Sequence, residues 1–437
     1  MSLFSKHSRS IPLNSLEKFM LAHESEHIAY NSQIVVEFKG DIQLELMRTA
    51  IDKAILEIPL LRSYIEETHF SFKRFYSTSA DFNSHQVVEL RDEVLDQDSI
   101  DQFCQKKFDL SKSPAFRFLI GKTQDQKNIL LFNVHHTLCD AAGQFNLMEE
   151  IFRVMNGMEI RQEAKKDKVF RYRSLWKYMG IKWFLGHIYA QLRPLKKQRQ
   201  YQMGSLIDHP EKTSRFVTSQ TFQLTADQQE KMRTACRKTN ISMTEHLTFK
   251  CFKALDSSLK SRGDFETPIM VYIPKTLRPL LKIRYSLQNI LTTVWIVGKR
   301  QEIHDPKFME KVKYIINSHK MDKAAKFIFG TLATCAFLKP STLKNIFLKF
   351  DQNPHASSSS LLISAGRVPR SFVFPTGWTD INIWARGTML KSPGVGVIFT
   401  GVAGAETITI EYLKYLVEKE TISNFKNNLF TELFQDS

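Results

Sequence analysis

Hydrophobic and polar positions in the first third of the chain alternate between the spacing of strands and the spacing of helices. Strands are expected at the short apolar runs 32–40, 70–77, 85–90, 115–121 and 128–134. A helix is expected over 41–59, where an apolar stripe consists of Leu46, Met47, Ala50, Ile51, Ala54 and Ile55. Two further helices are expected at 99–110 and 144–157, the second ending at Gly157.

The same alternation begins again in the second half of the chain. Strands are expected at 214–224, 267–274, 289–298, 394–404 and 406–413, and helices at 225–240, 242–259 and 422–434. Thr225 suits the N-cap of the first of these helices, and Ser242 with Glu245 forms a capping-box pattern before the next. The fold class predicted is therefore α/β, with two halves of similar size joined by residues 161–215.

Composition supports a globular chain that is long enough for two domains. It has 437 residues, of which 43% are hydrophobic and 24% are charged. Its five cysteines form no CxxC pair, which favours reduced thiols in a cytoplasmic protein without a zinc ribbon. The first residues have no apolar core of a signal peptide, so none is expected.

Positive charge is concentrated in the middle of the chain. The formal net charge is +16, and residues 161–199 contain twelve Lys or Arg against Glu163 and Asp167. Trp176 and Trp183 lie among these cations, so the segment could pack between the halves or rest on an anionic membrane. Contact residues for a membrane or a carrier protein are expected at Lys165, Lys166, Lys168, Trp176, Trp183, Lys196 and Lys197. No nucleic-acid motif accompanies them, and no nucleic-acid partner is expected.

A second apolar stretch, 327–350, is also a candidate for membrane contact. After Pro340 it predicts a helix with an apolar stripe and lysines beside it. The stripe is Leu343, Ile346, Phe347 and Phe350, and the lysines are Lys339, Lys344 and Lys349.

Chemistry is suggested by the sequence FNVHHTLCDAAG at residues 132–143. It places His135 and His136 at the end of an apolar run, with Asp140 four residues later. Successive side chains of an extended segment point to opposite faces, which argues against an iron site formed by both histidines and the aspartate. Two alternatives stay open from the residues alone: Cys139 as a nucleophile beside His136, and two histidines with a structural role. The chain lacks the P-loop, the GxSxG elbow and the HExxH motif.

The favoured interpretation is one catalytic histidine, one supporting histidine and one structural aspartate. A neutral imidazole can take a proton from an alcohol, amine or thiol at neutral pH. The activated acceptor can then attack a bound thioester without a covalent acyl-enzyme.

HHTLCDA at 135–141 resembles the HHxxxDG motif of the chloramphenicol acetyltransferase-like superfamily. That group includes nonribosomal-peptide condensation domains, wax ester synthase/diacylglycerol acyltransferases and polyketide-associated acyltransferases. LMRTAIDKAILEIPLLR, FDLSKSPAFRFLI, PIMVYIPKTLRP, YSLQNILTTVW and SSSSLLISAGRVP resemble further family segments. They occur in the family's order over nearly the whole chain.

The resemblance implies two chloramphenicol acetyltransferase-like lobes in a V-shaped pseudo-dimer, with a tunnel between them. It implies that His136 is the general base, supported by His135, and that Asp140 pairs with Arg278. Asn289 matches the family asparagine. The family glycine after the aspartate is Ala141 here, with Gly143 two residues later.

These observations predict an acyltransferase that uses acyl-CoA or an acyl carrier protein as donor and needs no metal or other cofactor. The expected division is an N-terminal lobe at 1–160, a basic aromatic segment at 161–215 and a C-terminal lobe at 216–437. The expected protein is a cytoplasmic monomer that can touch the inner membrane face. The alternatives are a free-standing condensation enzyme and a degenerate binding protein of the same fold.

Overall fold

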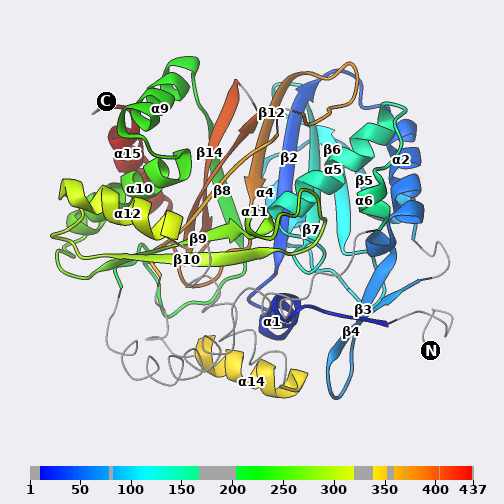
Figure 1. Ribbon diagram of the computed structural model, residues 1–437, viewed down its shortest axis with the longest axis horizontal. Coiled ribbons are helices and arrows are strands. Elements are labelled where there is room, and N and C mark those ends of the chain that lie inside the picture. Colours follow the sequence, from blue (N-terminus) through cyan, green and yellow to red (C-terminus); the bar gives the residue numbers. More distant parts are fainter. Residues whose placement is uncertain are drawn as a thin grey trace.

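The computed structural model describes residues 10–77, 82–166, 203–318, 338–351, 359–369, 371–402 and 404–435. Its two main sheets lie side by side, each with helices packed against it (Figure 1). The mixed α/β class predicted from the sequence is confirmed.

The N-terminal lobe is defined here as the sheet with strand order β12-β2-β7-β6-β5 and the helices packed on it. The strands are β2 (Asn31–Lys39), β5 (Val88–Val94), β6 (Phe116–Lys122), β7 (Asn128–His135) and β12 (Thr379–Arg386). One face packs against α2 (Leu44–Glu57) and α5 (Ala141–Met155), where the rings of Phe118 and Phe132 stack in the core. The opposite face packs against α4 (Gln97–Gln105).

The C-terminal lobe is the sheet with strand order β10-β9-β11-β13-β14-β8 and its helices. Its strands are β8 (Val217–Gln223), β9 (Ile269–Thr276), β10 (Leu291–Gly298), β11 (Leu361–Arg367), β13 (Val395–Val402) and β14 (Ala405–Leu413). The apolar core lies between this sheet and the helices α9 (Ala226–Thr239), α10 (Met243–Ser261), α12 (Pro306–Ser318) and α15 (Lys419–Phe434).

A smaller sheet, β1-β4-β3, lies beside the N-terminal lobe. It consists of β1 (Ser10–Pro12), β3 (Ser63–Glu67) and β4 (Phe72–Tyr76), and near it lie α1 (Ser15–His23) and α14 (Pro340–Asp351) (Figure 1). Short helices are α3 (Ser84–Val87), α6 (Gln162–Lys165) and α11 (Arg278–Leu281).

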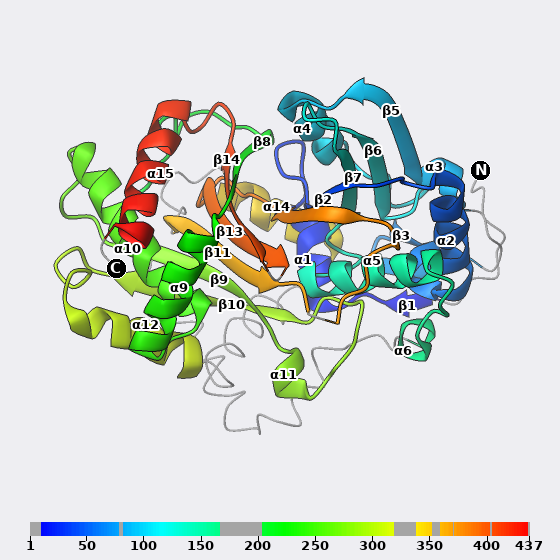
Figure 2. The same cartoon turned by 90° about the horizontal axis from the view of Figure 1, so that it is seen from above.

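The two lobes exchange a strand. β12 comes from the second half of the sequence, yet it pairs antiparallel with β2 of the N-terminal lobe, as Figure 2 also shows. The division at 1–160 and 216–437 therefore does not coincide with the two sheets at this strand, and no strand was predicted there.

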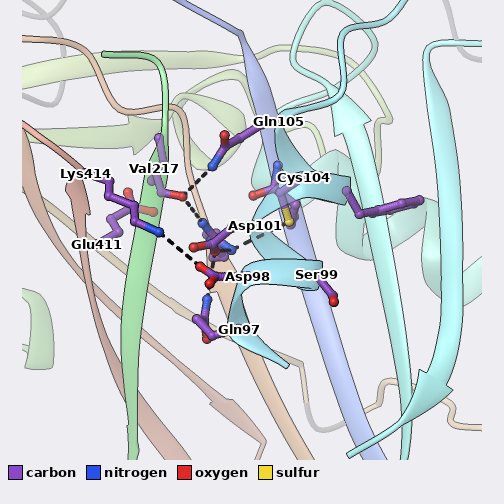
Figure 3. Close-up of polar contacts among 12 residues, drawn as sticks. Gln97, Asp98, Ser99, Asp101, Cys104, Gln105, Val217, Glu411 and Lys414 are labelled. Atoms are coloured by element: carbon purple, nitrogen blue, oxygen red, sulfur yellow. Dashed lines mark hydrogen bonds and ion pairs between the residues drawn. The ribbon is translucent and has the colours of Figure 1, made fainter. Parts of the chain in front are cut away.

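Polar contacts at α4 join the lobes (Figure 3). Arg386, at the end of β12, donates to Asp101 of α4 at 2.7 Å and to the carbonyl oxygen of Val217 in β8 at 2.7 Å. Lys414 donates to Asp98 at 3.0 Å. Burial raises the pKa of the nearby Glu411 to about 7, so this carboxyl is partly protonated at neutral pH. Asp101 is the carboxylate that Arg386 contacts directly.

The helix caps predicted from the sequence are confirmed at α9 and α10. Thr225 caps α9, and Ser242 with Glu245 forms the capping box of α10. Two predicted boundaries are wrong. The strand expected at 85–90 begins as helix α3, because Asn83 and Gln86 form a capping box and Ser84 bonds Asp52. The helix expected over 99–110 is α4, which ends at Gln105.

The interpretation of α14 as a membrane-facing stripe needs correction. Leu343 is buried, and Phe347 packs edge-on against Phe19 of α1 with ring centroids 4.9 Å apart. Ile346 is 45% exposed, so only part of the stripe faces outward. Much of it instead holds α14 against the N-terminal half of the molecule.

Candidate active site

The histidine pair lies at the end of β7, where backbone contacts fix both residues. The amide of His135 donates to Ala115 at 2.8 Å, and that of His136 donates to Tyr30 at 2.6 Å. The His135 ring is fully buried and bonds Thr137 at 2.7 Å and Glu24 at 3.2 Å. The His136 ring turns to the C-terminal lobe and stays partly exposed. Only His136 is therefore placed to meet a substrate.

Asn289, just before β10, is the polar partner of the His136 ring. Its Oδ1 lies 3.1 Å from Nδ1 of His136, and its Nδ2 donates to the His136 carbonyl oxygen at 2.6 Å. In the described part of the chain, Nε2 of His136 has no hydrogen-bond partner. Burial lowers the pKa of His136 below its ordinary value of 6.5, against the opposing effects of Asp140, of a hydrogen bond to the residue's own backbone and of Asn289. The imidazole is therefore neutral at neutral pH and can act as a base.

Asp140 connects the histidine loop to the C-terminal lobe. Its Oδ1 accepts from the Gly143 amide at 2.9 Å, which caps α5. Its Oδ2 accepts from Arg278 at 2.7 Å and from the Ile290 amide at 2.9 Å. Arg278 also donates to the carbonyl oxygens of Ser286 at 3.1 Å and Gln288 at 2.7 Å. The carboxylate thus holds the segment that carries Asn289 against the start of α5.

Gly143 is needed for a close approach between the lobes. A Cβ at this position would clash with the carbonyl group of Leu287. Ala141, which replaces the family glycine, is the first residue of α5, and its side chain is exposed. Helical backbone accepts alanine, so this departure from the motif leaves the loop intact.

Two alternative interpretations of the motif do not fit the geometry. Within the described residues, no group of three or more His, Cys, Asp or Glu side chains could hold a metal ion, and Asp140 bonds Arg278 instead. Cys139 is fully buried in the core of the N-terminal lobe, where it cannot meet a substrate as a nucleophile.

Several site residues were missed at the sequence level, and they come from α1 and β4. Glu17 is buried beside Arg74 at 3.6 Å and lies near Asn289. Arg74 donates to the carbonyl oxygen of Thr137 at 2.6 Å. Asn14 and Glu17 form a capping box, a pattern that could have located α1. No local pattern indicates that the same glutamate reaches Asn289.

Two of the proposed contact residues for a membrane or carrier lie in the described part. Lys165 pairs with Glu57 at 2.6 Å, so its charge is neutralised within the protein, whereas Lys166 is exposed. Lys168, Trp176, Trp183, Lys196 and Lys197 lie outside the described residues. No helix in the described ranges is long and apolar enough to span a bilayer.

A family profile described as Condensation domain matches residues 8–255, more than half of the chain. The chain belongs to the condensation-domain family. Among curated condensation-domain relatives, Gramicidin S synthase 2 of Brevibacillus brevis is 25% identical over 200 residues. The match spans 45% of this chain and 4% of that synthase.

Solved structures support a condensation-domain fold over nearly the whole chain. A trichothecene 15-O-acetyltransferase from Fusarium sporotrichioides aligns with a TM-score of 0.68 at 12% identity, covering 99% of this chain and 96% of that one. The epimerization domain of a tyrocidine synthetase aligns with a TM-score of 0.66 at 15% identity, covering 98% and 96%. The two-lobed architecture expected from the motif resemblance is confirmed.

Proposed function

We propose that this condensation-family protein is an acyltransferase that moves an acyl group from a thioester to a hydroxyl or amine. Nε2 of His136 removes the acceptor proton while the acceptor oxygen or nitrogen attacks the thioester carbonyl carbon. Collapse of the tetrahedral intermediate breaks the C–S bond. The imidazolium then returns the proton to the leaving thiolate, which regenerates the neutral base. No metal or other cofactor takes part in this mechanism.

The observation that carries the proposal is the free Nε2 edge of a neutral, partly exposed His136. Around it, Asp140 and Arg278 join the lobes and Asn289 holds the other edge of the ring. A tunnel between the lobes, as the family resemblance implies, would bring donor and acceptor to this edge from different sides.

Release of free thiol tests the proposal. The protein is incubated with a panel of acyl-CoAs and acyl carrier proteins, with small alcohols and amines as acceptors. We expect acceptor-dependent thiol release with at least one donor class, and mass spectrometry should detect the acylated acceptor.

If no donor of either class releases thiol, the degenerate binding protein would be favoured instead. Release with carrier-bound donors alone would favour the second candidate, a condensation enzyme that acts on carrier-bound intermediates. The observation that favours this candidate is that the curated relatives include peptide synthases such as Gramicidin S synthase 2.

The basic segment 161–199 is proposed to dock an acidic acyl carrier protein, because charge complementarity speeds and orients such encounters. Changing Lys166, Lys168, Lys196 and Lys197 to glutamate should abolish carrier binding measured by titration calorimetry. Turnover of acyl-CoA should be retained. Lys165 is left unchanged because it is paired with Glu57.

A matched control reverses the same number of exposed charges elsewhere, at Lys122, Lys212, Lys238 and Lys307. Carrier binding should survive in this control. Anionic and neutral vesicles are tested in parallel. A different outcome would assign the segment to a membrane surface instead. In that case the wild type would float with anionic vesicles at low salt and would not bind the carrier, and the first variant would no longer float.

A further inference from the structure

The Asn289 side chain occupies an unusual position, since it belongs to the C-terminal lobe but bonds the catalytic loop of the other lobe twice. It is fully buried. The next residue, Ile290, donates its amide to Asp140 at 2.9 Å, and the preceding Gln288 carbonyl accepts from Arg278 at 2.7 Å. The backbone on both sides of Asn289 is therefore fixed, which leaves its amide little freedom to move.

The orientation of the Asn289 amide follows from its neighbours. The backbone carbonyl of His136 can only accept, so the group 2.6 Å from it is the amide nitrogen. The buried Glu17 carboxyl lies near the same side chain. A rotated amide would place Oδ1 against the His136 carbonyl oxygen, a buried contact between two acceptors. Oδ1 therefore faces Nδ1 of His136.

An acceptor oxygen opposite Nδ1 determines the tautomer of a neutral imidazole. The proton must lie on Nδ1, which leaves the lone pair on Nε2, the edge without a partner in the described residues. Glu17 of α1 lies near this arrangement. Its Oε2 accepts from the Asn14 amide at 2.9 Å, and Arg74 lies 3.6 Å from its Oε1.

We propose that Asn289 is a positioning residue that stabilises the Nδ1–H tautomer of His136, in addition to the contact that the ring makes with the backbone carbonyl of His136 itself. The inference rests on the proposed role of His136 as a base. It adds a requirement that both lobes contribute to the base. The imidazole ring belongs to the N-terminal lobe, and Asn289, which stabilises its tautomer, belongs to the C-terminal lobe.

The tautomer is measured directly, without any substrate. Protein labelled with ¹⁵N-histidine is studied by long-range ¹H–¹⁵N NMR, and the His136 signals are assigned by their loss in His136→Ala. In the wild type above pH 7, we expect a protonated Nδ1 and an unprotonated Nε2. Asn289→Ala should populate the Nε2–H form alongside the Nδ1–H form, because only the backbone carbonyl of His136 then remains as an acceptor for the ring.

The matched control is Asn146→Ala. Asn146 of α5 donates to the Ser286 carbonyl oxygen at 3.1 Å, so it too holds the C-terminal segment, but no contact joins it to the His136 ring. This variant should keep the wild-type tautomer. A change of tautomer in both variants would mean that loop position alone matters, and the proposal would be wrong.

A second readout is the pH dependence of His136 modification by diethyl pyrocarbonate, followed by mass spectrometry of the peptide. The charged and titratable groups around the ring are Asp140 and His135 from its own loop and, through Asn289, Glu17 from α1. Asn289→Asp places a carboxylate beside the ring and should move the modification midpoint to higher pH, because a nearby negative charge stabilises the protonated imidazole. Asn289→Ala should move the midpoint to lower pH, because the Asn289 hydrogen bond stabilises the protonated ring.

Turnover completes the test. Loss of the tautomer should lower kcat and kcat/KM together, by roughly 10- to 10⁴-fold, the upper end matching the loss when a serine-protease histidine takes the wrong tautomer. If the wild-type ring is protonated on Nε2, the positioning role is refuted even if Asn289→Ala does not fold. A wild type with the Nδ1–H form but no thiol release from any donor would refute the acyltransferase proposal alone.

Discussion

His136→Ala is expected to fold normally and to lose about 10²–10⁴-fold in turnover, the contribution typical of a positioned general base. The backbone bond from its amide to Tyr30 remains after the substitution. The ring is partly exposed, so water can replace its contact with Asn289. Thiol release gives kcat, and thermal unfolding followed by circular dichroism checks the fold.

His135→Ala is the comparison variant for this experiment. In the wild type the His135 ring is fully buried between Thr137 and Glu24, so loss of the ring should reduce stability more than turnover. Equal turnover in wild type and His136→Ala would exclude the base mechanism.

The pH profile gives an independent check. Because burial lowers the pKa of His136 and protonation removes the base, kcat/KM should fall only below pH 6.5, the ordinary value.

Patterns that depend on neighbouring residues were predictable from the sequence. The apolar stripe of α2, the capping box of α10 and the strand that leads into His135 all follow from local spacing. The opposite directions of His135 and His136 follow from the alternation of side chains along an extended segment. The resemblance then supplied Arg278 and Asn289, which local spacing could not.

What could not be predicted depends on contacts between distant segments. β12 lies in the N-terminal lobe because it pairs with β2, more than 300 residues earlier in the chain. Glu17 looks like an ordinary capping residue, and it lies near Asn289 only because the lobes meet there. The requirement for glycine at 143 likewise comes from the carbonyl of Leu287 in the other lobe.

Asp140→Ala should destabilise the protein as well as slow it. Asp140 and Arg278 are both more than 90% buried and lie 2.7 Å apart. Removing one partner of a buried pair leaves the other charge uncompensated, which costs about 3–5 kcal/mol in the free energy of unfolding. The α5 cap is lost at the same time. Urea unfolding of wild type and variant measures the difference.

Two further variants separate the helix cap from the ion pair. Asp140→Asn keeps one acceptor oxygen, which can still cap α5 at the Gly143 amide, but loses the charge and the second acceptor that Arg278 and Ile290 share. Its difference in stability from alanine therefore measures the contribution of the cap. Asp140→Ala combined with Arg278→Leu should be no less stable than Asp140→Ala alone, because the uncompensated charge is gone. Turnover should stay low in the double variant, since the segment that positions Asn289 has lost its attachment to α5. An Asp140→Ala protein with unchanged stability and poor turnover would instead place the carboxylate in the chemistry itself.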